Sequence, residues 1–278
     1  MKLNTKAALL ILAFCQFNAQ ADMIDITVNG DLSDWGIQGT GKASDWLPHA
    51  GVHYTIQDLT GGPNVRVGAG WGGQAYDAEA LYAHLTDTHL FIALATGHNP
   101  ETAQNPSANS FGAGDFALDF GLNGVYELGI NVKPSWDNFG VAGGVYQVTE
   151  WAYGLWEDDT LPGYKKSDHP TSIIDGILLG QAVMAISGPK TGYGEWASDK
   201  HYFYEIALGL DLLRSAGWGG ESFNIHWTQM CANDSIIVEL PSVPEPEAVT
   251  LLLLGLIGTA WARLRKNVPL QGLAFELV

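Results

Sequence analysis

Basic side chains are scarce in this chain of 278 residues. There are 13 Lys and Arg residues against 30 Asp and Glu residues, which gives a formal net charge of -17. Nucleic acids and anionic lipids are bound chiefly through Lys and Arg, so we expect neither to be a partner. Charged residues make up only 15% of the chain and apolar residues 46%. A chain of this composition can bury a core, which excludes an intrinsically disordered protein.

The sequence also lacks the short motifs of common enzyme classes. Its eight histidines are scattered without the HExxH spacing of a zinc site, and neither a GxSxG motif nor a Gly-rich phosphate loop occurs. Paired carboxylates would suit a glycoside hydrolase, but that chemistry depends on a separation between two carboxyl groups that the sequence does not give. We therefore expect a protein that is not an enzyme.

The N-terminal segment has the pattern of a secretory signal peptide. Lys2 and Lys6 precede an apolar run from Ala7 to Phe14, and Ala19-Gln20-Ala21 supplies the small residues that a signal peptidase accepts. We interpret residues 1–21 as a signal peptide, so the mature protein is expected to be exported.

A second apolar run, residues 248–262, precedes a basic cluster and predicts a transmembrane span whose basic end stays in the cytoplasm. A Pro-Glu-Pro tripeptide, a Leu-rich span and a basic cluster in this order resemble the PEP-CTERM sorting signal of Gram-negative bacteria. The resemblance implies processing by an exosortase-type protease and delivery to the cell surface or extracellular matrix. Residues 267–278 form an extra tail that such signals usually lack, and a plain membrane anchor is the alternative. Within residues 243–266, the resemblance is carried by Pro244, Glu245, Pro246, Arg263, Arg265 and Lys266.

Between the two ends lies one expected domain, residues 22–242, with 27 acidic and 8 basic side chains and a net charge of -19. It holds a single cysteine, Cys231, so no intramolecular disulfide can form. Short apolar or alternating runs bounded by turn residues predict β-strands, and residues 211–216 predict a short helix with Asp211 as its N-cap. We therefore expect an all-β domain, a single antiparallel β-sandwich of jelly-roll or immunoglobulin-like topology. The predicted strands are residues 24–28, 52–56, 80–85, 90–95, 116–120, 126–132, 145–153, 177–186, 202–208, 223–228 and 235–240.

Three stretches of this domain carry a resemblance to a known family. Residues 26–35 combine a strand, an Asn-Gly turn and a Trp, and they resemble the opening of family 9 carbohydrate-binding modules and the related DOMON-like sandwiches. Residues 80–95 are similar to the central hairpin of that family, and residues 204–208 are similar to its late strand. The resemblance implies a sandwich that binds carbohydrate.

An aromatic segment with neighbouring carboxylates is the predicted ligand-binding region. Aromatic rings can stack on the C–H face of a sugar while polar neighbours bond its hydroxyls. Core packing is the alternative for any single Trp, and Trp227, which alternates with Phe223 and Ile225, is assigned to the core. The candidate ligand contacts are Trp136, Tyr146, Trp151, Tyr153 and Trp156.

Paired carboxylates could supply the hard oxygens that Ca²⁺ prefers. Asp77 and Glu79 lie two residues apart before a predicted strand, so they are expected to face the same side and are the first candidate metal ligands. Ordinary solvated turn carboxylates are the alternative, since the chain has no EF-hand pattern. The other candidate pairs are Asp31 with Asp34 and Asp115 with Asp119.

These features favour an exported, non-catalytic β-sandwich that binds carbohydrate, with the cell's own exopolysaccharide as the expected glycan. The first alternative is a structural matrix protein with a calcium-stabilised sandwich and no specific sugar ligand. A glycoside hydrolase is the least favoured alternative.

Overall fold

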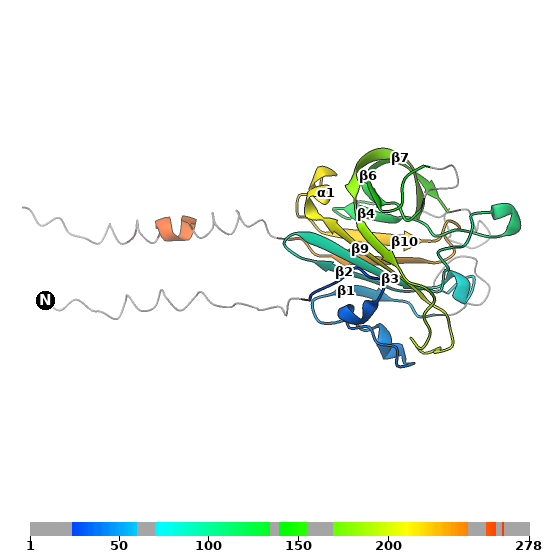
Figure 1. The fold of residues 1–278 in the computed structure, drawn as a ribbon. Coiled ribbons are helices and arrows are strands. Elements are labelled where there is room, and N and C mark those ends of the chain that lie inside the picture. Colours follow the sequence, from blue (N-terminus) through cyan, green and yellow to red (C-terminus); the bar gives the residue numbers. More distant parts are fainter. Residues whose placement is uncertain are drawn as a thin grey trace, which may run out of the picture.

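The computed structural model describes residues 24–59, 70–133, 139–154, 169–243, 254–259 and 263. Its described strands form two antiparallel sheets that face each other in a sandwich-like fold (Figure 1). This confirms the predicted all-β class. The five-stranded sheet contains, in spatial order, β1 (His53–Ile56), β2 (Ala78–Leu85), β3 (His89–Thr96), β9 (Tyr202–Gly209) and β8 (Val183–Ile186). The six-stranded sheet contains β11 (Ser235–Leu240), β10 (Phe223–Thr228), β4 (Phe116–Phe120), β5 (Leu128–Ile130), β6 (Gly144–Tyr153) and β7 (Pro170–Gln181).

Short helical turns connect or cover these strands. They are η1 (Leu32–Trp35), η2 (Ala43–Trp46), η3 (Gln74–Tyr76), η4 (Pro106–Ala108) and the α-helix α1 (Leu210–Ser215). The predicted N-cap of α1 was wrong, because the helix begins one residue earlier and Gly209 occupies that position. Leu210 is buried, and its N–H donates to Thr88 O at 3.0 Å. Asp211 instead lies in the first turn, where its charge is favourable.

Two of the predicted strands differ from the structure by more than two residues at an end. Residues 24–28 form no strand, and the Thr27 N–H donates to the Asp34 carboxylate at 2.7 Å instead of to a neighbouring strand. Residues 177–186, predicted as one strand, divide between β7 and β8, which belong to different sheets. The chain changes sheets at Ala182, whose N–H donates to Gly143 O.

The main core lies between the two sheets. Leu81 and Ile92 of the five-stranded sheet belong to the same buried cluster as Phe116 and Ile225 of the six-stranded sheet. Trp227 is also fully buried, and its indole N–H donates to Gly114 O at 3.1 Å. The prediction that Trp227 packs in the core is confirmed.

A second core lies on the outer face of the five-stranded sheet. The segment that contains η1 and η2 (blue in Figure 1) packs Trp35 and Trp46 against Tyr82 and Phe203. Both tryptophans are fully buried, and the Tyr82 hydroxyl donates to Trp46 O at 2.8 Å. The N-terminal segment therefore forms a covering layer of the domain, although it contributes no strand before β1.

Glu205 of β9 anchors this covering segment. Its carboxylate accepts backbone N–H groups from Asn29 at 2.9 Å, Gly30 at 2.6 Å and Asp31 at 3.2 Å. The indole N–H of Trp35 donates to the other oxygen at 2.8 Å. Gly30 has a φ of 80°, which lets the Asn-Gly turn close around the carboxylate. The first turn of the domain is thus held by one buried carboxylate.

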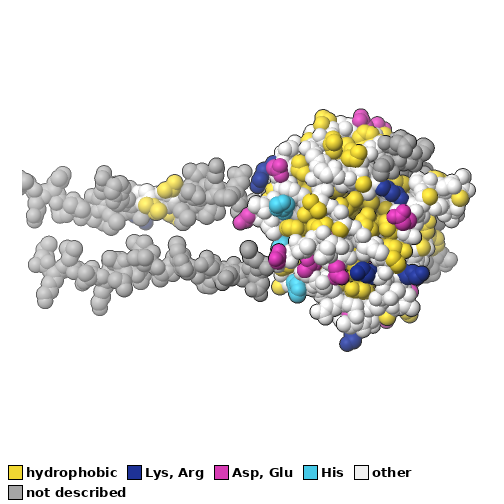
Figure 2. Space-filling view, in the orientation of Figure 1, with side chains coloured by type: hydrophobic (Ala, Val, Ile, Leu, Met, Phe, Trp, Pro, Cys, Tyr) yellow, Lys and Arg dark blue, Asp and Glu magenta, His cyan; other side chains and the backbone are white. Residues whose placement is uncertain are grey.

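Apolar side chains are exposed on two edge strands, β7 and β8. Ile177 is 60% exposed and Val183 is 63% exposed. In the space-filling view, hydrophobic side chains occupy much of the displayed face of the domain, with acidic and basic side chains scattered among them (Figure 2).

The two predicted processing segments fall mostly outside the described residues. This applies to residues 1–21, Pro244, Glu245, Pro246, Arg265 and Lys266. Of the expected span 248–262, residues 254–259 are described and helical, and Arg263 is described beyond it. Within the described part of the chain, no helix is both long and apolar enough to span a bilayer.

Candidate functional site

A cleft of about 560 Å³ opens where β2 begins, β3 ends and β9 begins. Three chain segments that are distant in sequence meet there, and the cleft volume lies within the range of small-molecule sites. Its lining combines two aromatic rings with amide, hydroxyl and charged groups. The lining residues are Gln74, Ala75, Tyr76, Gly97, Asn99, Thr102, Ser198, Asp199, Lys200 and Tyr202.

The close approach of η3 to the end of β3 shapes one side of the cleft. The Gly97 N–H donates to Asp77 O at 2.9 Å, and the Thr96 hydroxyl donates to the same carbonyl. A Cβ atom on Gly97 would lie 1.7 Å from Gln74 O. Only glycine therefore fits at position 97 without moving η3 away.

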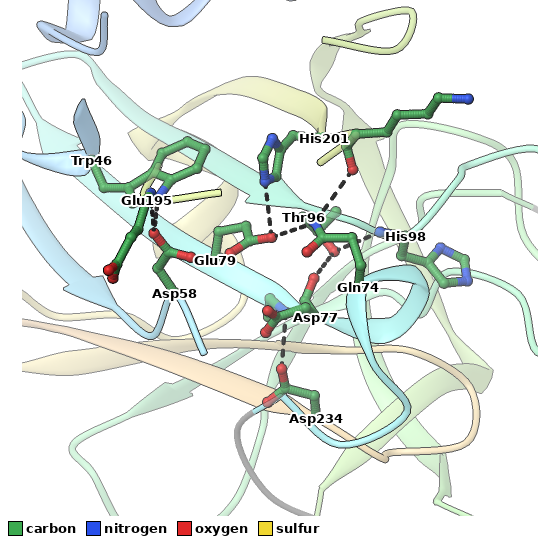
Figure 3. A network of polar contacts seen from close by, with 12 residues as sticks. Trp46, Asp58, Gln74, Asp77, Glu79, Thr96, His98, Glu195, His201 and Asp234 are labelled. Carbon is green, nitrogen blue, oxygen red and sulfur yellow. Dashed lines mark hydrogen bonds and ion pairs between the residues drawn. The ribbon is translucent and has the colours of Figure 1, made fainter. Parts of the chain in front are cut away.

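Hydrogen bonds beneath the cleft orient Gln74. Its amide nitrogen donates to Glu79 Oε1 at 2.7 Å and lies 3.4 Å from Lys200 O. The same Glu79 oxygen lies 3.1 Å from His201 Nε2, and both of these side chains are buried (Figure 3). The Gln74 amide nitrogen is therefore committed to the protein, and its carbonyl oxygen remains as an acceptor.

Lys133 and His98 hold the segment that carries Asn99 and Thr102. The Lys133 ammonium donates to Thr102 O at 2.7 Å and to Pro100 O at 3.3 Å. His98 Nε2 donates to a backbone carbonyl, that of Phe111, at 2.8 Å, and burial lowers the His98 pKa to about 4. His98 is therefore neutral at physiological pH. These bonds fix the wall of the cleft in a defined position.

Asp77 lies below this wall, between the carboxyl groups of Glu79 and Asp234 (Figure 3). Burial raises the pKa of Asp77 to about 10, with further increases from the charges of Glu79 and Asp234. Burial also raises the pKa of Asp234 to about 6, although the Ala78 N–H donates to it at 2.9 Å. The Asp77 carboxyl is therefore protonated at neutral pH, next to the Asp234 carboxyl group.

The structure brings the predicted metal ligands Asp77 and Glu79 close together but gives them different contacts. Both side chains are fully buried; Asp77 directly precedes β2, and Glu79 lies at a register irregularity between Ala78 and Ala80. Glu79 Oε1 contacts Gln74 and His201, whereas Glu79 Oε2 and both Asp77 oxygens accept no N–H or O–H donor. In the described ranges, no three His, Cys, Asp or Glu side chains are placed to hold a metal ion.

The other predicted carboxylate pairs bind backbone groups. The Asp31 carboxylate accepts the Ser33 N–H at 2.9 Å, and the Asp34 carboxylate accepts the Thr27 N–H. Asp119 accepts the N–H groups of the hairpin turn between β4 and β5.

Asp115 is a buried structural carboxylate on the six-stranded sheet. It accepts N–H groups from Val132 at 2.8 Å and Ile173 at 2.9 Å. Burial raises its pKa to about 7, although these hydrogen bonds oppose the increase. Asp115 and Asp119 are only 1% and 2% exposed, so neither is an ordinary solvated carboxylate.

Three of the predicted aromatic ligand contacts, Tyr146, Trp151 and Tyr153, lie on β6 of the other sheet and do not line the cleft. Tyr146 is buried, and Trp151 packs against Gly129 with its indole N–H donating to Tyr126 O at 2.9 Å. Tyr153 is 48% exposed. The remaining two residues, Trp136 and Trp156, lie outside the described residues.

The sequence pattern does not mark Asp234 or the residues that line the cleft as a site. The Asp234 carboxylate meets the Ala78 N–H across a sequence separation of 156 residues. No local motif marks Asn99, Ser198 or Tyr202, because each becomes a lining residue only when the strand ends meet.

Comparisons with known proteins add no relative. No protein-family model matches the chain, and a search of the curated proteins finds no match. The resemblances to PEP-CTERM proteins and to family 9 carbohydrate-binding modules therefore stay predictions.

Proposed function

We propose that this protein is an exported, non-catalytic β-sandwich that binds carbohydrate through the cleft between the ends of β2, β3 and β9. The observation that carries the proposal is the combination of Tyr76 and Tyr202 with hydroxyl and amide groups in one cleft. A sugar presents both an apolar C–H face and many hydroxyls, so it needs this mixture of ring surface and hydrogen-bonding groups.

The carboxylates of the cleft favour binding over hydrolysis. Among the described residues that line it, Asp199 is the only Asp or Glu. A glycosidase of the common type needs two carboxyl groups on either side of the scissile bond. Glu79 lies beneath the cleft, where its Oε1 atom is engaged by Gln74 and His201.

The cellular setting of the proposal comes from the two processing segments. Residues 1–21 support export, and residues 243–266 support exosortase processing with a membrane-inserted intermediate. The expected partner is therefore an exopolysaccharide or another glycan at the cell surface or in the matrix. The exposed ring of Tyr153, together with Trp136 and Trp156 of the same aromatic segment, is proposed as a second contact with a long polymer.

Substitution of Asn99 and Ser198 by Ala tests the cleft. Both side chains are exposed and line it, so the double variant should weaken glycan binding about tenfold or more, since each lost hydrogen bond contributes about 0.5 to 1.5 kcal/mol. The urea midpoint should not change. A glycan array followed by affinity electrophoresis measures binding.

The matched control is Thr149→Ala, which removes an exposed hydroxyl from β6 outside the cleft. The double variant and Thr149→Ala should both unfold at the same urea concentration as the wild type. If the wild type binds a glycan and the double variant binds it equally well, the cleft is not the binding site. Tyr153→Ala then tests the aromatic segment.

A calcium-stabilised matrix protein without a specific sugar is the second candidate function. The observation that favours it is the burial of both Asp77 oxygens and Glu79 Oε2 without a donor. Carboxylate oxygens of this kind would be neutralised by Ca²⁺, and Asp77 with Glu79 would hold the ion together with non-carboxylate oxygens.

Calcium should then raise the melting temperature of the domain, and a chelator should reverse the increase. An ion that binds only the folded state at a hundredfold excess over Kd stabilises it by about 2.7 kcal/mol. Differential scanning fluorimetry with calcium, magnesium and chelator measures the effect, and the double variant Asp77→Ala with Glu79→Ala should abolish it. Identical melting curves in calcium and in chelator would contradict a calcium site.

A further inference from the structure

We infer that the cleft selects uncharged, hydroxyl-rich glycans and discriminates against polysaccharides that carry carboxylates. The inference rests on the proposed function, because it names the class of carbohydrate that the same cleft accepts. Two independent properties of the cleft support it: the hydrogen-bonding capacity of Gln74 and the distribution of charge.

Gln74 presents an acceptor to the cleft. Its amide nitrogen donates to Glu79 Oε1, so the atom left for a ligand is the carbonyl oxygen. A sugar hydroxyl can donate a hydrogen bond to this oxygen, whereas an ionised carboxylate has no hydrogen to donate. A carboxylate placed there would lose hydration without gaining a partner, which is costly.

The carboxylates around the cleft act in the same direction. Asp199 is half-buried in the lining, and the Glu79 carboxyl group lies directly beneath Gln74. Among the described lining residues, Lys200 is the only Lys or Arg, and its side chain is exposed to solvent, where its attraction is screened. The Lys133 ammonium behind the wall is already bonded to the carbonyls of Thr102 and Pro100. Asp199 is half-buried, so its charge is screened less than that of the exposed Lys200, and a ligand in the cleft experiences it.

The charge of the whole domain adds a repulsion at longer range. Residues 22–242 carry a net charge of -19, which slows the approach of any polyanion. A neutral polymer is not repelled. The local charge of the cleft and the net charge of the domain can be separated, because removing a charge far from the cleft changes only the net charge.

The test compares neutral polymers with their own carboxymethylated derivatives. Hydroxyethyl cellulose, dextran and a galactomannan serve as neutral probes, and affinity is measured for the full chain at about 20 mM and about 300 mM NaCl. Each bound neutral polymer should bind at least about tenfold more tightly than its carboxymethylated form at low salt. The difference should shrink at high salt because screening weakens repulsion.

Asp199→Asn is the cleft variant, and Asp175→Asn is the matched control. Asp175 is exposed on β7 and does not line the cleft, so both substitutions remove one negative charge. Asp199→Asn should reduce the ratio of the affinity for the neutral polymer to that for its carboxymethylated form by at least about threefold. Asp175→Asn should leave the ratio unchanged within error.

Equal or tighter binding of the carboxymethylated polymers at low salt would overturn the inference while leaving carbohydrate binding intact. An equal effect of the two substitutions would also overturn it, because discrimination would then arise from the charge of the whole domain. Absence of binding to every polymer on a broad glycan array would instead defeat the proposed function itself. The failures of the two proposals are therefore distinguishable.

Discussion

Replacing Glu205 with Ala is expected to lower the free energy of unfolding by about 3 to 5 kcal/mol. The carboxylate accepts four N–H groups from the covering segment, and two of the donors, those of Gly30 and Trp35, are buried. A buried donor left without a partner costs about 1 to 3 kcal/mol. The substitution also releases the turn that brings Trp35 onto the sheet, so the effect on stability should be among the largest of any single carboxylate.

Urea denaturation of Glu205→Ala, Glu205→Gln and a control variant measures this effect. Glu205→Gln keeps one carbonyl acceptor but turns an NH₂ group toward other donors, so an intermediate loss is expected. Glu195→Ala removes an exposed carboxylate and should change stability by no more than about 0.5 kcal/mol. A loss below about 1 kcal/mol in Glu205→Ala would show that apolar packing of Trp35, not the carboxylate, holds the covering segment.

Stability of the metal-free domain is expected to fall as pH rises, and Asp77→Asn is expected to remove much of this dependence. The folded protein retains a proton on Asp77, with a pKa of about 10, and raises the pKa of Asp234 to about 6. The unfolded chain releases these protons near the ordinary Asp pKa of 3.8. Between about pH 4 and about pH 10 the folded state thus binds more protons than the unfolded state, so stability decreases with pH.

An Asn at position 77 should supply a donor to Asp234 without a proton that can be lost. We expect Asp77→Asn to be more stable than the wild type at about pH 8, because the wild type must take up a proton on Asp77 when it folds and the variant need not. The gap should widen by up to roughly 1.4 kcal/mol for each pH unit above the ordinary Asp pKa. Urea denaturation in chelator at a series of pH values measures the difference. Because the chelator removes metal ions, stabilisation by a bound ion does not contribute to this difference.

Asp115 provides the internal control for this experiment. Its pKa of about 7 lowers stability with rising pH in both proteins, so the difference between the two curves reports Asp77 and Asp234. Asp77→Asn should leave the Asp115 contribution in place. If wild type and Asp77→Asn lose stability in parallel from about pH 5 to about pH 9, the two aspartates do not share a proton.

Local sequence pattern predicted β4, β10 and β11 at their observed bounds. Their apolar residues alternate or form short runs flanked by polar and turn residues, so each strand is specified by residues close to it in the chain. Residues 24–28 have a similar local pattern but form no strand. A strand also requires a neighbouring strand, and whether one is present depends on distant residues.

The same limit applies to the candidate site. The spacing of Asp77 to Glu79 marks it as a chemical candidate, but its second carboxyl neighbour, Asp234, comes from the connection between β10 and β11. The cleft likewise forms from η3, the segment after β3 and the segment before β9. None of these residues is marked by a short motif.

The sequence by itself determined the acidic charge, the β-strand periodicity and the burial of Trp227, because these follow from residue type and local alternation. Only the tertiary structure decided which carboxylates are buried, which of them retain a proton, and where a cleft opens. Burial and pKa depend on the groups that surround a side chain in space, and in this fold those groups come from strands far apart in the sequence.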